Sequence, residues 1–236
     1  MTTAIILAGG LGTRLRSVVP DWPKPMAPVG GKPFLTYLLD YWIGQGIDHF
    51  ILSVGYRHEL ISGFFGSSYH GTPLDYAVET EPLGTGGALR LAARHCLNQN
   101  GFVLLNGDTF FAVDLARLRA YAAQQRADLC LSLFETTDLS RYHGVDLGAD
   151  GMIASLHRQS VADHCLANGG VYWCEPERLS LETHASGACS LENDVFPALF
   201  ANRYRIAGRP FQAPFIDIGI PEDYHRAEQF LLQGAL

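Results

Sequence analysis

The chain has 236 residues, of which 47% are hydrophobic and 17% are charged, and its formal net charge is −7 at pH 7. This length is enough to bury a substantial core, in one large domain or in two small ones. The negative charge argues against a broad surface for nucleic acid or for an anionic membrane, because both partners require a cationic footprint. An anionic ligand must therefore be held by a local cluster of positive charge.

The sequence shows no sign of secretion or membrane insertion. Its first apolar run is about five residues long, too short for the core of a signal peptide, and no basic leader precedes it. No segment approaches the ~18 apolar residues of a membrane span. The cysteines, 5 in number and without CxxC spacing, are Cys96, Cys130, Cys165, Cys174 and Cys189. We expect them to be reduced and mostly buried, and the protein to be cytoplasmic.

Apolar periodicity in the first half predicts strands that alternate with helices, which is typical of a parallel sheet with crossover helices. Strands are expected at residues 3–8, 49–54, 74–79, 101–108 and 127–135. Helices are expected at residues 33–46, 57–65 and 114–125, and residues 81–97 are expected to form a loop that leads into a further helix.

The pattern changes after residue 136. Residues 144–158 predict a hairpin that turns at "GADG", residues 168–174 and 211–219 predict strands, and helices are expected from Leu191, after the N-cap Ser190, and at 221–233. We therefore expect an α/β fold with a mostly parallel central sheet flanked by helices. Residues 1–136 are predicted to form a nucleotide-binding half, and residues 137–236 a smaller α+β lobe packed against it.

A glycine-rich segment, "LAGGLGTR" at residues 7–14, follows the first predicted strand. Such a turn exposes successive backbone N–H groups, which form an anion-binding concavity at the carboxyl end of the strand. A dinucleotide fingerprint is excluded because Leu15 stands where glycine or alanine is required, and no Walker A sequence is present. The segment predicts a phosphate-binding loop of a third type; a purely structural turn is the alternative.

Lysine is scarce in this chain. Among 17 basic residues only Lys24 and Lys32 are lysines, and both follow the glycine-rich segment closely. An ammonium is a compact point charge, whereas a guanidinium is a planar fork, so this usage indicates a site that requires a point charge; chance is the alternative.

The segment "GGLGTRLRSVVPDWPKPMAPVGGKPF" resembles the signature of the sugar-1-phosphate nucleotidyltransferases, GGxGTRL followed by a P-K segment. The resemblance continues through "EPLGTGGAL", "LNGD", "NGGVY" and "FIDIGIPEDY", and so spans nearly the whole chain. Within the family, these motifs are most similar to guanylyltransferases that act on a heptose 1-phosphate. The resemblance implies a single Rossmann-like domain, residues 1–236, that transfers GMP from GTP to a sugar 1-phosphate for cell-surface polysaccharide synthesis.

In this reaction a phosphate oxygen attacks the α-phosphorus of a nucleoside triphosphate and pyrophosphate leaves. The attacking phosphate is largely ionised at neutral pH, because its second pKa is about 6, so no general base is needed. Catalysis then consists of aligning and neutralising two polyanions. The resemblance assigns catalysis to Arg14 and Lys24. It assigns nucleotide binding to Leu7, Gly9, Gly10, Gly12, Thr13, Glu81, Gly86 and Asn106. In this assignment Glu81 accepts hydrogen bonds from guanine. A turn at the start of a helix is the alternative role for residues 84–87.

Two aspartates are expected at the ends of apolar strands, Asp108 in "FVLLNGD" and Asp217 in "FIDIG". Carboxylates placed opposite bound phosphates suit Mg²⁺, which takes oxygen ligands and keeps part of its coordination for substrate. The resemblance implies that both aspartates bind Mg²⁺ as the cofactor; a capping role is the alternative for each.

The sugar side departs from the family pattern. The resemblance assigns sugar-phosphate binding in the 137–236 half to Gly144, Asn168 and Arg158, but "LHRQ" stands where the family has F-x-E-K. Arg158 and Gln159 therefore replace the glutamate and lysine that hold the sugar and its phosphate. Arg158 could bind the phosphate through a bidentate contact; alternatively the site takes a different sugar or has lost activity.

Other functions stay open. Within the same class these are mannose-1-phosphate guanylyltransferase and amino-sugar-1-phosphate uridylyltransferase. A nucleotide-sugar-binding regulatory subunit and a glycosyltransferase are the alternatives from other classes. We expect small-molecule substrates and neither nucleic-acid nor membrane partners, and the sequence leaves the oligomeric state open. Hexapeptide repeats are absent, so no left-handed β-helix domain is expected.

Overall fold

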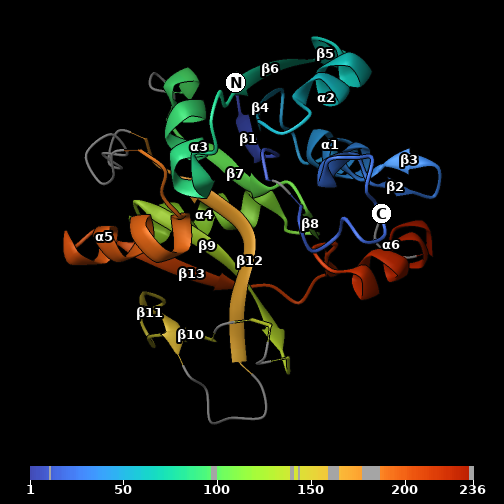
Figure 1. Cartoon of the computed structure of the whole chain (residues 1–236). Coiled ribbons are helices and arrows are strands. Elements are labelled where there is room, and N and C mark those ends of the chain that lie inside the picture. The colour runs from blue at the N-terminus through green and yellow to red at the C-terminus, as the bar shows by residue number, and fades with distance from the viewer. Residues whose placement is uncertain are drawn as a thin grey trace.

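The computed structural model describes residues 1–10, 12–96, 100–138, 141–142, 144–158, 165–176 and 187–233, with the backbone alone described at 157, 158 and 233. A central sheet is flanked by helices (Figure 1). The predicted elements of the first half are β1 (Thr3–Leu7), α1 (Phe34–Gly44), β4 (His49–Val54), α2 (His58–Phe65), β6 (Thr72–Val78), α3 (Gly84–Ala93), β7 (Phe102–Asn106), α4 (Leu115–Gln125) and β9 (Leu129–Thr136).

The second half adds further strands and two helices. These are β10 (Gly144–Leu147), β11 (Ile153–Arg158), β12 (Cys165–Cys174), a π-helical turn η3 (Leu191–Val195) that continues into α5 (Phe196–Ala201), β13 (Ile206–Pro210), β14 (Phe215–Asp217) and α6 (Pro221–Gln233). Short elements complete the described chain: η1 (Lys24–Met26), the hairpin β2 (Pro28–Val29) and β3 (Lys32–Pro33), β5 (Ser68–Tyr69), η2 (Arg94–Cys96) and β8 (Thr109–Phe111).

The main sheet has ten strands in the order β11-β10-β12-β7-β1-β4-β6-β5, and β9 joins β12 to β13. Seven of these ten strands (β1, β4, β6, β7, β9, β10 and β13) run in one direction, and β5, β11 and β12 run in the other. The predicted α/β fold with a mostly parallel sheet is therefore confirmed. Since β12 pairs with β7, the sheet continues without a break from the first half of the chain into the second.

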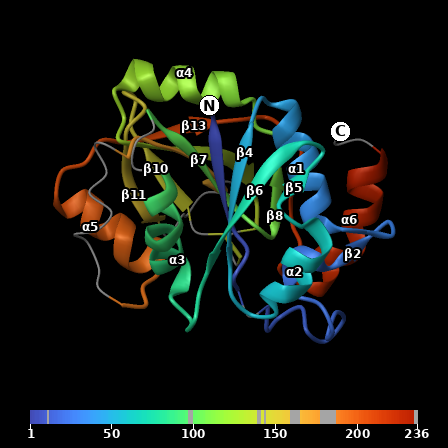
Figure 2. The same cartoon turned by 90° about the horizontal axis from the view of Figure 1, so that it is seen from above.

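The sheet separates two apolar cores, because successive side chains of a strand point to opposite faces. In β1, Ala4 and Ile6 face one core and Ile5 faces the other. Figure 2 shows α1, α2 and α6 on one side of the sheet and α3 and α5 on the other. All five cysteines are buried, as predicted.

Three strand predictions need correction. The strand predicted to end at Asp108 ends at Asn106, so Asp108 lies in the turn between β7 and β8. The strand predicted at residues 211–219 is reduced to β14, which pairs with β8 in a separate ribbon rather than with the main sheet. Strand β13 was not predicted, because "IAGRP" contains Gly208 and Pro210; a Cβ at Gly208 would lie 2.7 Å from Leu133 Cδ1, so close packing against β9 requires glycine.

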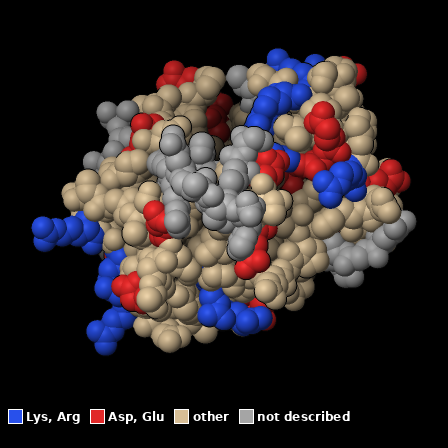
Figure 3. Space-filling model, turned by 90° about the horizontal axis from the view of Figure 1, so that it is seen from below, with Lys and Arg blue, Asp and Glu red and all other residues tan. Residues whose placement is uncertain are grey.

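Acidic and basic side chains are interspersed on the described part of the face shown in Figure 3, and most of that surface is neither. None of the helices in the described ranges combines the length and the apolar character needed to cross a lipid bilayer.

Candidate active site

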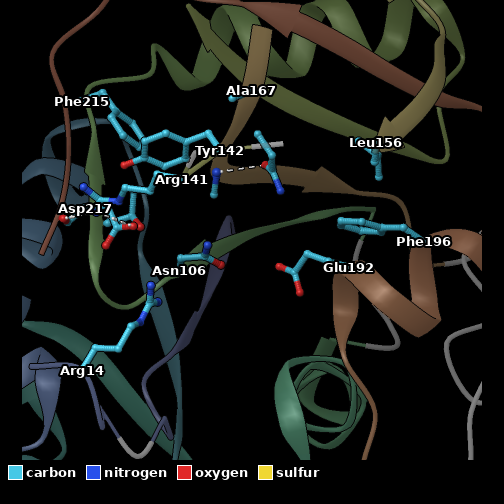
Figure 4. A pocket seen from close by; sticks show the side chains of 14 residues that line it. Arg14, Asn106, Arg141, Tyr142, Leu156, Ala167, Glu192, Phe196, Phe215 and Asp217 are labelled. Atoms are coloured by element: carbon cyan, nitrogen blue, oxygen red, sulfur yellow. Dashed lines mark hydrogen bonds and ion pairs between the residues drawn. The ribbon is translucent and has the colours of Figure 1, made fainter. Parts of the chain in front are cut away.

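Two cavities meet beside the carboxyl ends of the parallel strands β1, β4, β6 and β7. The larger has a volume of ≈ 870 Å³ and the smaller a volume of ≈ 380 Å³. They share five lining residues: Arg14, Asn106, Thr109, Glu192 and Asp217. Figure 4 shows Arg14 and Glu192 pointing into the smaller cavity from opposite walls, with Asn106 between them.

Most residues predicted to bind the nucleotide line the larger cavity: Leu7, Gly9, Gly10, Gly12, Thr13, Glu81 and Asn106. The predicted catalytic residues Arg14 and Lys24 line it too. Asp108 and Asp217 line it as well. Gly86 does not, because it is buried inside the first turn of α3. The structure therefore brings the glycine loop, both predicted basic side chains and both aspartates to one place.

The glycine loop lies against two functional side chains. A Cβ at Gly9 would collide with the Glu79 carboxylate, and a Cβ at Gly12, whose φ is +62°, would lie 3.0 Å from Lys24 Cγ. A side chain at either position would therefore displace Glu79 or Lys24, and at Gly12 the left-handed backbone also favours glycine.

Lys24 holds the first aspartate. It begins the 3-10 turn η1 between Pro23 and Pro25, and its Nζ lies 2.8 Å from Asp108 Oδ2. The Lys24 side chain is only 13% exposed and that of Asp108 is 31% exposed, so this ion pair is stronger than one on the open surface.

The pairing of β14 with β8 brings the second aspartate beside the first. Asp217 lies opposite Thr109 in this ribbon, and Ile218 N donates to Asp108 O at 2.9 Å. Burial, and then the negative charge of Asp108, raise the pKa of Asp217; the Gly219 N–H, Arg141 and Lys24 act against the rise. The two carboxylates are therefore close enough to repel each other.

Arg141 pairs with this second aspartate and was missed in the sequence. Its NH2 lies 3.1 Å from Asp217 Oδ2 and donates to Asp217 O at 2.9 Å, while NH1 contacts Asp223. The only sequence signal was its place three residues after Asp138, a turn-forming aspartate, in "SRYHG" just before β10. Each aspartate thus has a basic partner that fixes its orientation.

The aspartate pair fits a divalent cation. Its donors are carboxylate oxygens, which Mg²⁺ prefers, and a cation between them would relieve the repulsion that raises the pKa of Asp217. Within the described ranges no group of three or more His, Cys, Asp or Glu side chains could hold a metal. The pair would therefore supply part of a coordination shell and leave the remainder to substrate phosphates.

A second glutamate lies deeper in the larger cavity than the predicted one. Glu79, just after β6, is half-buried; it accepts from Leu83 N at 3.0 Å, and burial raises its pKa. Glu81 also lines the cavity but is exposed. The position of Glu79 at the carboxyl end of a parallel strand was the signal that sequence reasoning did not use.

Segment 187–192 of the second half packs against the start of α3 and supplies Glu192 to the wall of the larger cavity. Gly86 N donates to Cys189 O at 2.9 Å, and Cys189 N donates to Leu83 O at 2.8 Å. A Cβ at Gly84 would lie 2.5 Å from Cys189 O, and one at Gly86 2.8 Å from Cys189 Sγ. Since α3 begins at Gly84, these glycines form a helix entry and also allow this close packing.

The smaller cavity contains one of the three residues predicted to bind the sugar phosphate. Asn168 lines it, donating through Nδ2 to Tyr172 OH at 2.7 Å and accepting from Gly170 N at 3.1 Å. Gly144 does not line it; its backbone lies opposite that of Arg158 in the β10–β11 pair. The Arg158 side chain and Gln159 lie outside the described residues, so their roles stay predictions.

The "NGG" motif forms a bulge in β12 that turns Asn168 toward the cavity. The pairing of β12 with β9 shifts register between Asn168 and Tyr172, and Gly170 has a φ of +72°. A Cβ at Gly170 would lie 2.7 Å from Asn106 Nδ2. Glycine here therefore sets the position of Asn106 at the junction of the two cavities.

Gly170→Ala is expected to destabilise the protein and to lower its activity. The left-handed backbone alone costs about 1–2 kcal/mol with a Cβ, and Asn106 must also move. Gly63→Ala is the matched control, because Gly63 lies exposed within α2 with open space around it, and alanine there should stabilise by about 0.5–1 kcal/mol. Urea denaturation of both variants measures the difference; equal free energies of unfolding would contradict it.

The fold and the site together define an α/β protein in which a glycine-rich loop, two basic side chains and two aspartates line one cavity at the carboxyl ends of parallel strands. The chain belongs to the nucleotidyl transferase family, whose model matches residues 3–234. The predicted membership of the sugar-1-phosphate nucleotidyltransferases is thereby confirmed.

Named relatives match over nearly the full chain. A D-glycero-alpha-D-manno-heptose 1-phosphate guanylyltransferase of Aneurinibacillus thermoaerophilus is 43% identical over 228 residues, which cover 97% of each protein. One of the same name from Campylobacter jejuni subsp. jejuni is 38% identical over 224 residues, 94% of this chain and 96% of the relative. The crystal structure of HddC from Yersinia pseudotuberculosis complexed with GMP-PN superposes with a TM-score of 0.82 at 34% identity, over 97% of this chain and 99% of that one.

Proposed function

We propose that this protein transfers GMP from GTP to D-glycero-α-D-manno-heptose 1-phosphate, giving a GDP-sugar and pyrophosphate. The observation that carries the proposal is the aspartate pair held by Lys24 and Arg141 where the two cavities meet. The names of the two relatives support the choice of base and sugar. An activated heptose is a donor for polymer assembly, so we infer a role in cell-surface polysaccharide synthesis.

The larger cavity would hold the nucleotide and the smaller one the sugar phosphate. The N–H groups of the glycine loop would bind the triphosphate, and Arg14 would hold its terminal phosphates. Lys24 would lie across the reacting phosphates, where its charge stabilises the transition state. Asp108 and Asp217 would hold Mg²⁺, which supplies further neutralisation of the triphosphate.

The sugar end rests on fewer described residues. Asn168 offers a fixed amide to the substrate, while the contributions of Gly144 and Arg158 are proposals from family resemblance alone. Mannose 1-phosphate with GTP, and an amino-sugar 1-phosphate with UTP, are the alternative substrate pairs. A regulatory subunit would bind these molecules without turnover.

The experiment that tests this function is mass spectrometry of products. The protein is offered GTP or UTP with Mg²⁺, together with heptose 1-phosphate and mannose 1-phosphate in one mixture. A GDP-heptose product in excess over GDP-mannose supports the proposal. Tight binding of GTP without release of pyrophosphate would instead indicate a regulatory subunit.

Glu79→Gln is expected to raise the KM for GTP about tenfold or more and to lower the preference for GTP over UTP. A carboxylate can accept hydrogen bonds from both N1–H and N2–H₂ of guanine, whereas a glutamine side chain has a single acceptor oxygen and can replace only one of them. Hydrogen bonds to charged groups are worth about 1.5–3 kcal/mol. Glu81→Gln is the matched control, expected to change the KM less than about twofold because Glu81 is exposed. A large rise in the KM for GTP in Glu81→Gln, with little change in Glu79→Gln, would assign base recognition to Glu81 instead.

A further inference from the structure

Glu192 is held rigidly in the wall between the two cavities. It lies in η3, whose N-cap Ser190 accepts from Asn193 N at 3.1 Å. Ser190 Oγ donates to Glu192 Oε2 at 3.2 Å, and Thr85 Oγ1 donates to the same oxygen at 3.3 Å. Thr85 is itself fixed because its Oγ1 accepts from Leu191 N at 2.7 Å. Two hydroxyl groups, one from each half of the chain, therefore orient this carboxylate.

The position of this negative charge determines what it can bind. Both cavities are lined by Glu192, and the basic side chains lie on the opposite side of the smaller one, where Arg14 and Arg141 converge near Asp217 (Figure 4). A phosphate beside Glu192 would be repelled, whereas a carboxylate oxygen is a strong acceptor for hydroxyl groups. The phosphate end of a substrate therefore belongs with the arginines, and its uncharged hydroxyl-bearing end with Glu192.

The walls next to Glu192 suit the ring of a sugar. Leu156 and Phe196 form an apolar side of the smaller cavity, and Asn168 supplies a fixed amide. The negative charge of Glu192 is close enough to Tyr172, the hydrogen-bond partner of Asn168, to add to the effect of burial in raising the Tyr172 pKa. Glu192 and Asn168 thus serve one part of the cavity, with an apolar surface beside them.

We propose that Glu192 binds hydroxyl groups of the sugar ring of the sugar 1-phosphate and so determines which sugar is accepted. This inference rests on the proposed function. It supplies a carboxylate acceptor for a site in which Arg158, in the "LHRQ" segment, stands where the family pattern has a glutamate. Because Oε2 accepts both of the hydrogen bonds that the described residues donate to Glu192, Oε1 is the oxygen that we assign to the substrate hydroxyl.

The first test separates the sugar from the nucleotide. Glu192→Gln keeps an oxygen that can accept from Ser190 and Thr85 but removes the charge, so it should raise the KM for the sugar 1-phosphate about tenfold or more and leave the KM for GTP within about twofold. Glu228→Gln, an exposed position on α6 outside both cavities, is the control of equal charge. An unchanged KM for the sugar 1-phosphate would overturn the proposal. So would a rise in the KM for GTP alone, or a rise that disappears when 2′-deoxy-GTP replaces GTP, since Glu192 would then bind the ribose.

The second test uses mannose 1-phosphates that each lack one hydroxyl group. Wild-type protein should discriminate strongly against at least one of these analogues. Glu192→Ala should accept that analogue as well as mannose 1-phosphate itself, since the variant has no carboxylate that the missing hydroxyl group would leave unpaired. Equal discrimination by both proteins would overturn the proposal. Calorimetric titration of the same sugars with Mg²⁺ and a non-hydrolysable GTP analogue measures binding without turnover, so loss of the proposed reaction is distinguishable from loss of this contact.

Discussion

Replacing Lys24 by alanine is expected to lower the turnover number about a hundredfold or more, the effect of removing one preorganised electrostatic contact from a transition state. The Lys24 ammonium is 2.8 Å from Asp108 and almost buried, and its stem lies against Gly12 of the glycine loop. Its removal takes away a positive charge where the phosphates would react, and it leaves the carboxylate pair without one of its two basic partners. Single-turnover measurement of pyrophosphate release is the appropriate assay.

The chain supplies its own control for this variant. Lys32, its other lysine, is exposed in the hairpin of β2 and β3 and lines neither cavity, so Lys32→Ala should retain turnover within about twofold. Lys24→Arg preserves charge but not shape and should recover only part of the rate. A near-normal rate for Lys24→Ala would remove this residue from the mechanism.

Replacing Asp217 by asparagine is expected to abolish tight binding of a divalent cation and to lower turnover by roughly a hundredfold to a thousandfold, the scale of losing metal-ion stabilisation. Electron paramagnetic resonance of Mn²⁺ measures the binding directly, independently of activity. Asp75→Asn is the control, because Asp75 lies on β6 outside both cavities and its side chain is 56% exposed. Cation binding by Asp217→Asn as tight as in wild-type protein would contradict the assignment.

The same variant has an expected signature in stability. A carboxyl group whose folded-state pKa is raised binds its proton more tightly in the folded protein than in the unfolded chain. The contribution of Asp217 to stability therefore falls as pH rises from the ordinary aspartate pKa of 3.8 through its raised pKa in the folded protein. At neutral pH and without metal, Asp217→Asn should therefore melt no lower than wild-type protein. Added Mg²⁺ should raise the melting temperature of the wild type alone.

Short-range features of the site could be predicted from the sequence. The glycine loop, Lys24 and Asp108 follow strands that are evident from their apolar runs, and the carboxyl ends of parallel strands must meet at one edge of a sheet. The strand boundaries were less certain: Asp108 lies in a turn, and the segment around Asp217 forms a ribbon with β8.

Side chains supplied by the second half could not be found in this way. Arg141 reaches Asp217 across 76 positions of the chain, and Thr85 reaches Glu192 across 107. Neither contact leaves a periodic pattern, because each depends on the packing of two elements against each other. Similarly, both Glu79 and Glu81 line the larger cavity, and only the tertiary structure shows that Glu79 is half-buried whereas Glu81 is exposed.

The sequence by itself determined the family, the α/β alternation and the place of the glycine-rich loop, because these depend on local motifs and on apolar periodicity. Only the tertiary structure decided how the site is assembled: the ribbon that sets Asp217 beside Asp108, the bulge at Gly170 that turns Asn168 inward, and the contact of segment 187–192 with α3 that brings Glu192 to the junction. The physical reason is that strand register and close backbone approach are set by packing between distant segments, which no single stretch of sequence encodes.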